Sequence, residues 1–420
     1  MRKKDNRYAG RETDENKEKF FLITRLLGIL MLSLMLQGCD AAKNRETNVN
    51  EPAAETQENK IIVADEPDKA SDSGNGMEDN DTGEDNTMLN VETEDAISYS
   101  SIPVEEAPKD DEVEEVQSEE DKVLRTEDGK VIVDLIMFMG QSNMSGTGGN
   151  AQYAPKVPGG YGYEFRAISD PTRLYPIEEP FGINENVRGA IEDLPIAKRG
   201  SMVSAFVNRY YELTGVPVVA VSASSGGRDT DFWMRREVED DFAERQKRAQ
   251  VWLESNDYYI RKQYVIWLQG ESDAEDGLTP ELYNQNMDNI IRMLFIGGLQ
   301  KVFIVTPGRT LTGKYYFDNI VYSQINMCKT SGYYALATTV LNSVSTEYMV
   351  DEYHYNQSVL NVVGKEAAES AAYYTLNRKE KPLYNYRDND IYVPEGFDYT
   401  ADELKVEPID YNNNGELVRY

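Results

Sequence analysis

Residues 131–149 constrain the fold of this chain more than any other stretch. They read V-I-V-D-L-I-M-F-M-G-Q-S-N-M-S-G-T-G-G, and the first nine are apolar apart from Asp134. Such an apolar run, rich in branched side chains, is typical of a strand buried on both faces of a parallel sheet. The run ends at Gly140, and a polar cluster around Ser142 follows at once. Open α/β sheets bind ligands just past the carboxyl ends of their strands. Ser142 is therefore a candidate nucleophile, the alternative being a serine that only caps the next element.

The amino-terminal segment predicts export. Residues 1–19 are basic, and within the apolar run 20–36 the uncharged core 26–36 suits a signal peptide but is too short to span a bilayer. The run ends in L-Q-G-C, which resembles the lipobox of bacterial lipoproteins, where the cysteine becomes the lipidated first residue. We expect residues 1–39 to be a lipoprotein signal peptide, with Cys39 lipidated and the protein anchored to the outer face of a bacterial cell membrane. An uncleaved anchor helix is the alternative.

Residues 40–120 predict a linker. They hold 26 acidic and 5 basic residues, a net charge of −21 out of −31 for the whole chain. Large apolar side chains are sparse there, so the segment cannot bury enough surface to offset the entropy of ordering it. We expect an acidic, disordered stalk between the membrane and a folded domain. Its acidity is common in solvated linkers and indicates no partner, and we expect no nucleic-acid partner. The oligomeric state stays open.

Residues 121–380 have the length and the alternating pattern of one α/β domain. Residues 151–195 look irregular, and residues 381–420 form a Tyr- and Asn-rich extension that either wraps the domain or extends from it. We expect strands at 131–139, 216–222, 264–268, 301–306 and 334–339, and helices at 201–213, 236–254, 280–294, 317–330 and 358–376. The result would be a central five-stranded parallel sheet covered by helices on both faces.

Four polar clusters follow predicted strands, so a parallel sheet would bring them to one edge. They are residues 140–143, 225–227, 269–271 and 351–354. The last contains His354, the only histidine in the chain, which excludes zinc sites built on several imidazoles, as the two cysteines exclude a cysteine cluster. One histidine can still serve as general base toward a serine hydroxyl, with a nearby carboxylate such as Asp351 holding its ring. An ordinary surface or packing histidine is the alternative.

These clusters resemble the SGNH (GDSL-like) hydrolases, and specifically the sialate O-acetylesterase-like carbohydrate esterases. The family runs G-Q-S-N-M, Gly-Gly, W-x-Q-G-E-x-D and D-x-x-H stand here at 140–144, 226–227, 267–273 and 351–354. The resemblance covers about residues 131–376. It implies a flavodoxin-like three-layer α/β/α fold and removal of acetyl groups from sugar hydroxyls without a metal or cofactor. The G-x-S-x-G elbow of ordinary α/β-hydrolases is absent from the sequence, in agreement with this family.

The resemblance also implies roles for individual residues. Ser142 would be the nucleophile and His354 the base, with Asp351 favoured over Glu271 as the carboxylate that orients the ring. The oxyanion donors would be the backbone N–H of Ser142, the N–H of Gly227 or Gly226, and the side-chain amide of Gln269.

Three further residues are candidates for substrate binding, namely Gln141, Asn143 and Arg228. Arg228 and Asp229 stand where the family has small hydroxyl residues, and Arg228 would meet a carboxylated sugar or, the favoured alternative, pair with Asp229. Leu268 replaces a histidine often found before the Gln. The sequence therefore predicts an exported serine esterase that acts on acetylated carbohydrate, whether sialic acid, xylan or another glycan. A catalytically inactive sugar-binding lipoprotein on the same fold is the alternative.

Overall fold

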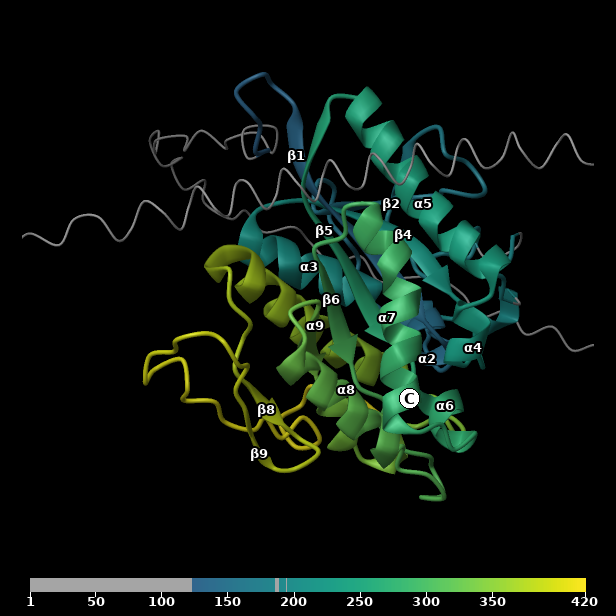
Figure 1. The fold of residues 1–420 in the computed structure, drawn as a ribbon, viewed down its shortest axis with the longest axis vertical. Coiled ribbons are helices and arrows are strands. Elements are labelled where there is room, and N and C mark those ends of the chain that lie inside the picture. Colours follow the sequence, from purple (N-terminus) through teal and green to yellow (C-terminus); the bar gives the residue numbers. More distant parts are fainter. Residues whose placement is uncertain (1–122, 186–188, 194) are drawn as a thin grey trace, which may run out of the picture. The chain divides into compact units, whose positions relative to one another are not determined.

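A computed structural model describes residues 123–185, 189–193 and 195–420 (Figure 1). The predicted signal peptide with its lipidation site at Cys39 and the predicted acidic linker lie outside these residues. Within the described ranges, no helix is long and apolar enough to cross a membrane.

The centre of the domain is a sheet built around β1 (Val131–Gly140). β1 pairs in parallel with β4 (Val218–Ser224) on one side and β5 (Tyr258–Leu268) on the other. Beyond β5, β6 (Lys301–Val305) and β7 (Tyr334–Thr338) continue the parallel arrangement. These are the five strands expected from the apolar runs, so the prediction of an α/β fold on a parallel sheet is confirmed.

The sheet is larger than expected, because two short strands extend it beyond β4. β2 (Gly162–Phe165) pairs in parallel with β4, and β3 (Leu174–Pro176) pairs antiparallel with β2. In the described residues the order is β3-β2-β4-β1-β5-β6-β7, seven strands rather than five. Both extra strands lie in the segment 151–195, which was expected to be irregular. Strands this short contain too few residues for a period of two to stand out.

Helices cover both faces of the sheet, which gives the expected three layers (Figure 1). α3 (Val203–Thr214) and α9 (Gln357–Asn377) pack on the face that carries Ile136 and Phe138. α5 (Arg236–Ser255), α7 (Pro280–Ile296) and α8 (Asp318–Thr330) pack on the face of Met137 and Met139. Successive side chains of a strand point to opposite faces, so the apolar run of β1 supplies both cores.

Three short helices directly follow strands or their turns. They are α2 (Ser142–Ser145) after β1, α4 (Thr230–Trp233) after β4 and α6 (Glu271–Glu275) after β5. Each begins within a few residues of the carboxyl end of its strand, so the polar clusters of the sequence lie at the edge where these ends meet.

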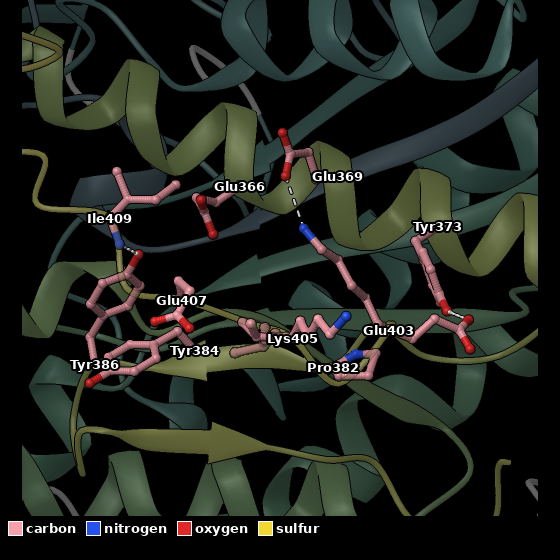
Figure 2. Close-up of a pocket in the computed structure, with 13 residues that line it drawn as sticks. Glu366, Glu369, Tyr373, Pro382, Tyr384, Tyr386, Glu403, Lys405, Glu407 and Ile409 are labelled. Carbon is pink, nitrogen blue, oxygen red and sulfur yellow. Dashed lines mark hydrogen bonds and ion pairs between the residues drawn. The ribbon is translucent and has the colours of Figure 1, made fainter. Parts of the chain in front are cut away.

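The extension 381–420 packs on the domain rather than leaving it. It forms the hairpin of β8 (Leu383–Asn385) and β9 (Asp390–Tyr392), and its Tyr411 and Leu417 are buried in the core beside α9. A cavity of about 290 Å³ is lined by residues of α9 and of the extension, and Figure 2 shows these residues. Tyr373 on α9 donates a hydrogen bond to Glu403 of the extension, and within the extension Ile409 N–H donates to the Tyr386 hydroxyl at 3.2 Å.

Candidate active site

A cavity of about 400 Å³ lies at the carboxyl ends of β1, β4 and β5. All four polar clusters of the sequence contribute to it. The residues that line it are Gln141, Ser142, Thr147, Asp193, Ala197, Gly226, Gly227, Glu271, Ser272, Glu275, Tyr353 and His354. The sheet topology therefore collects residues more than 200 positions apart in sequence around one hollow.

Ser142 stands where β1 turns abruptly into α2. The turn uses Gly140, which has a φ of +141° and whose position leaves no room for a Cβ, since one would lie 2.0 Å from the Leu268 carbonyl oxygen. Ser142 is the first residue of α2 and is 9% exposed at the cavity wall. First-turn N–H groups have no acceptor within their own helix, so the N–H of Ser142 is open to an oxygen in the cavity.

His354 and Asp351 lie on the loop that precedes α9. The ring Nδ1 of His354 is 2.8 Å from Asp351 Oδ2, while Asp351 Oδ1 accepts the N–H groups of Tyr353 at 3.0 Å and His354 at 2.9 Å. Partial burial tends to raise the pKa of Asp351, but the bond to the His354 ring and the two N–H donors hold it below its ordinary value. An ionised Asp351 keeps the proton of the neutral ring on Nδ1, which leaves Nε2 as the proton acceptor.

Glu271, the other candidate for orienting the ring, makes a different contact. Its Oε1 accepts from Asn143 Nδ2 at 2.9 Å, and its Oε2 is buried without a hydrogen-bond partner in the described part of the chain. Burial raises the pKa of Glu271, against the opposing effects of the Asn143 amide and the nearby His354. Two carboxylates were candidates for orienting the His354 ring, and Asp351 is the one within hydrogen-bond distance of its Nδ1.

The two glycines after β4 differ in what their N–H groups do. Gly226 N–H donates to Asp193 Oδ2 at 3.2 Å, whereas Gly227 is exposed in the cavity with a φ of +64°. A Cβ added to Gly226 would meet Ser142 Cβ at 3.5 Å, an ordinary contact, so crowding does not require glycine there. The positive φ of Gly227 does favour glycine. Within the described residues its N–H, unlike that of Gly226, has no acceptor in the fold, so Gly227 is the stronger candidate for oxyanion donor.

Gln269 does not fit the role of oxyanion donor that sequence suggested. Its side chain is fully buried outside the cavity lining. The amide Nε2 donates to Asp273 and to the Arg228 carbonyl oxygen, and Oε1 accepts from the Tyr283 hydroxyl at 3.2 Å. Because its donors and its acceptor are engaged within the fold, Gln269 instead ties the loop after β4 to α6.

Of the three candidate substrate-binding residues, only Gln141 lines the cavity. Asn143 is 2% exposed and bonds to Glu271 and to the Tyr353 carbonyl oxygen. The guanidinium of Arg228 lies over the Phe232 ring at 4.6 Å, its Nε donates to Ser225 Oγ at 3.3 Å, and Arg228 is not among the residues that line the cavity. The carboxylate of Asp229 caps α4 by accepting Phe232 N–H at 2.8 Å.

The structure adds residues that sequence reasoning missed. Asp193 and Glu275 line the cavity, and Glu275 stands four residues after Glu271 on α6, a spacing that places both on one helix face. Asp193 comes from an irregular segment without any pattern that would have drawn attention to it.

A series of buried hydrogen bonds connects Asp193 to Lys198. Ser145 Oγ lies 2.7 Å from Asp193 Oδ2 and 3.0 Å from Ser224 Oγ, which also accepts from Lys198 Nζ at 3.0 Å. Burial lowers the pKa of Lys198 to about 8, with Asp193 and Glu179 opposing the shift.

The sequence matches the family model described as carbohydrate esterase, sialic acid-specific acetylesterase, over residues 132–373. That match spans more than half of the chain. The chain belongs to this family. It is therefore a carbohydrate O-acetylesterase, as the resemblance implied. No curated protein matches the chain.

Solved structures with a similar fold include three that share little sequence with the esterase. A protein of Arabidopsis thaliana is 19% identical, with a TM-score of 0.43 over 57% of this chain and 98% of its own. A carbohydrate acetylesterase from Xanthomonas citri is 16% identical, with a TM-score of 0.37 over 60% of this chain and 59% of its own. A mutant of an acetyl-xylooligosaccharide esterase from Geobacillus stearmophilus is 10% identical, with a TM-score of 0.33 over 56% and 91%.

Proposed function

We propose that Ser142, His354 and Asp351 are the catalytic triad of a serine esterase that removes O-acetyl groups from sugar hydroxyls through an acetyl-serine. Ser142 Oγ attacks the acetyl carbonyl carbon while His354 Nε2 takes the hydroxyl proton. The tetrahedral intermediate then collapses, and the sugar oxygen leaves with that proton as a free hydroxyl. Water repeats the sequence on the acetyl-serine, with His354 again as base and then as acid, and releases acetate.

The observation that carries this proposal is the pairing of His354 Nδ1 with Asp351 Oδ2 at 2.8 Å beside Ser142 in one cavity. Asp351 fixes the tautomer of the ring and stabilises the imidazolium that forms in each half-reaction. The negative oxygen of the tetrahedral intermediate is assigned to the N–H groups of Ser142 and Gly227. Backbone donors of this kind are fixed before the reaction and cost no reorganisation during it.

Substitutions of the nucleophile and the base test the proposal. Ser142→Ala and His354→Ala are each expected to lower kcat by roughly 10⁴-fold or more on an O-acetylated methyl glycoside, measured as acetate release. The double variant is expected to lose little beyond either single one, because the two residues act as a unit. Ser255→Ala, at an exposed serine that ends α5, serves as the matched control and keeps kcat within about twofold. Losses that multiply in the double variant would contradict a shared role.

We also propose that the esterase is exported and held at the outer face of a bacterial membrane through a lipid on Cys39, where it meets acetylated cell-wall or host glycans. The basic residues 1–19, the apolar core 26–36 and the L-Q-G-C run support this. Cells fed a labelled fatty acid are expected to label the full chain and not its Cys39→Ala variant. Equal labelling of both, or of neither, would contradict the anchor.

A further inference from the structure

The wall of the catalytic cavity carries hydrogen-bond acceptors that the fold leaves unused. In the described part of the chain, Gln141 Oε1, Thr147 Oγ1, Glu271 Oε2 and Glu275 Oε1 are buried without a hydrogen-bond partner. Gln141 is only 4% exposed and Glu271 only 3%. Buried polar atoms nearly always have a partner, and leaving one without costs about 1–3 kcal/mol. Three of the four atoms are amide or carboxylate acceptors, and Thr147 Oγ1 can accept or donate, so the hollow suits a ligand that supplies donors.

The same wall is negatively charged. Asp193, Glu271 and Glu275 line it, and Asp351 lies just behind His354. Among the described lining residues there is no lysine or arginine.

Three cations of the surrounding segments do not line the cavity. Lys198 is 4% exposed and donates to Ser224, the Arg228 guanidinium lies on Phe232, and exposed Lys314 lies 4.6 Å from the centre of the Tyr315 ring. Lys314 also interacts electrostatically with Glu275 and Tyr353, but it is exposed to solvent and does not line the cavity. A ligand in the cavity therefore meets carboxylate oxygens and carbonyl-type acceptors, with only a solvent-screened positive charge nearby. In a partly enclosed site such charges act more strongly than they do in bulk water.

We propose that this cavity selects uncharged acetylated sugars, whose hydroxyls donate to the unused acceptors, and discriminates against sugars that carry a carboxylate, with Glu275 as a specificity-determining residue. A sugar hydroxyl has a proton to donate, whereas an ionised carboxylate is only an acceptor and adds a like charge. The inference rests on the proposed function, because it places the acetyl ester at Ser142.

Glu275 is the residue through which the charge can be changed with least disturbance. Asp193 holds Gly226 N–H and Ser145, and Glu271 holds Asn143, so replacing either alters the turns around the nucleophile. Glu275 ends α6 and takes part in none of these contacts, and its hydrogen bond to the Tyr353 hydroxyl raises the pKa of that tyrosine. A glutamine keeps the shape and an acceptor oxygen while it removes the charge.

The decisive substrates differ in one group only, namely an O-acetylated methyl glucuronide and the corresponding glucuronamide. At low ionic strength we expect kcat/KM to be roughly tenfold or more higher on the amide, with the ratio falling as salt screens the wall. Glu275→Gln is expected to reduce the ratio at least threefold by raising kcat/KM on the glucuronide. Glu281→Gln, the same charge change at an exposed position on α7, is the matched control and should leave the ratio unchanged.

Equal or faster hydrolysis of the glucuronide would overturn the inference, as would a ratio that Glu275→Gln leaves as it was. If neither ester is hydrolysed, hydrolysis of the O-acetylated methyl glycoside decides whether the proposed function fails. Binding of both esters to Ser142→Ala, followed by ligand NMR, still decides the charge selection. Binding of the amide alone supports the inference, whereas binding of both equally, or of neither, overturns it.

Discussion

The two sides of the active site are built by different means. The α2 turn with Ser142 grows directly out of the central strand, and its neighbours Asn143 and Ser145 are 2% and 1% exposed. On the loop before α9, the side chain of His354 is 16% exposed and that of Asp351 is 51% exposed. The nucleophile is thus held by the core, while the base and its carboxylate are held by a surface loop.

Residues from the C-terminal extension fasten that loop on both sides of His354. Asn412 accepts the N–H of Ser345 at 3.0 Å and donates to the Ser343 carbonyl oxygen at 3.2 Å. After His354, Asn356 Nδ2 donates to the Val418 carbonyl oxygen at 3.0 Å. The extension thus replaces, with a few hydrogen bonds, the support that the sheet gives to Ser142.

Asn143 joins the two sides directly. Its Nδ2 donates to the Tyr353 carbonyl oxygen at 3.1 Å as well as to Glu271, and its Oδ1 accepts Tyr355 N–H at 3.5 Å. Tyr353 and Tyr355 flank His354 in sequence. The side chain of Asn143, next to the nucleophile, therefore also holds the loop segment that carries the base. We therefore expect the Ser142–His354 geometry to depend on these polar contacts of Asn143 as well as on core packing.

The largest effect is expected on the loop side, at the carboxylate of Asp351. Asp351→Asn should lower kcat by roughly 10²–10³-fold because the ring loses its tautomer control, less than for a buried triad carboxylate because water screens the exposed one. Glu271→Gln should cost about tenfold, since a glutamine oxygen can still accept from Asn143. Steady-state kinetics of both variants decide the assignment, and a greater loss in Glu271→Gln would give the orienting role to Glu271.

A smaller effect is expected at Asn143, which joins the two sides of the site. Asn143→Ala should lower kcat by about 10–100-fold with little change in KM, because the hydrogen bonds that hold the His354 loop next to the Ser142 turn are lost. It should also reduce the free energy of unfolding by about 1–3 kcal/mol, since Glu271 and Tyr353 are left with unpaired buried oxygens. Kinetics and urea unfolding test both parts. A loss of stability without any loss of kcat would show that the contacts of Asn143 do not determine the catalytic geometry.

The expected effect of loosening the C-terminal extension is smaller again. Asn412→Ala should lower kcat about threefold to tenfold and speed hydrogen exchange in residues 343–356 without changing exchange in α2. Asn413→Ala is the control, because exposed Asn413 bonds only locally to Asp410 at 2.8 Å. Equal exchange in the two variants would mean that the loop holds itself in place.

The least effect on activity, but a distinctive one on stability, is expected at Lys198 on the sheet side. Its pKa is lowered to about 8 in the folded protein, so between about pH 8 and 10.5 the unfolded chain binds the proton more tightly. Below that window the cost of burying the ammonium is fully present, and it disappears as pH rises through the window. Relative to Lys198→Met, the protein should gain up to roughly 3 kcal/mol of stability over this range. A pH-independent difference would show that Lys198 is not buried as a cation.

The sequence alone was sufficient to predict the five parallel strands and the five long helices. The apolar runs located the five parallel strands, and the 3.6-residue pattern located α3, α5, α7, α8 and α9 to within about two residues. These patterns missed β2 and β3, two short strands at one end of the sheet. The order of strands and polar clusters also predicted that these clusters meet, because the carboxyl ends of parallel strands lie at the same edge of the sheet.

Sequence could not tell which way a side chain points after a strand ends. Gln269 and Asn143 are both amides just past a strand, yet Gln269 turns into the core and Asn143 bridges to the loop of His354. Asp193 could not be found either, because its place in the cavity depends on the path of an irregular segment. These positions are set by tertiary contacts, which no local pattern encodes.

Covalent trapping tests the central claim most directly. The esterase would be treated with an aryl phosphonate that mimics the tetrahedral intermediate, digested, and mapped by mass spectrometry, alongside its Ser142→Ala and His354→Ala variants. The account predicts one adduct per chain on Ser142, none in Ser142→Ala and much slower labelling in His354→Ala. Stoichiometric labelling of Ser145, Ser272 or any other residue, or full hydrolysis of acetylated sugar by Ser142→Ala, would contradict it.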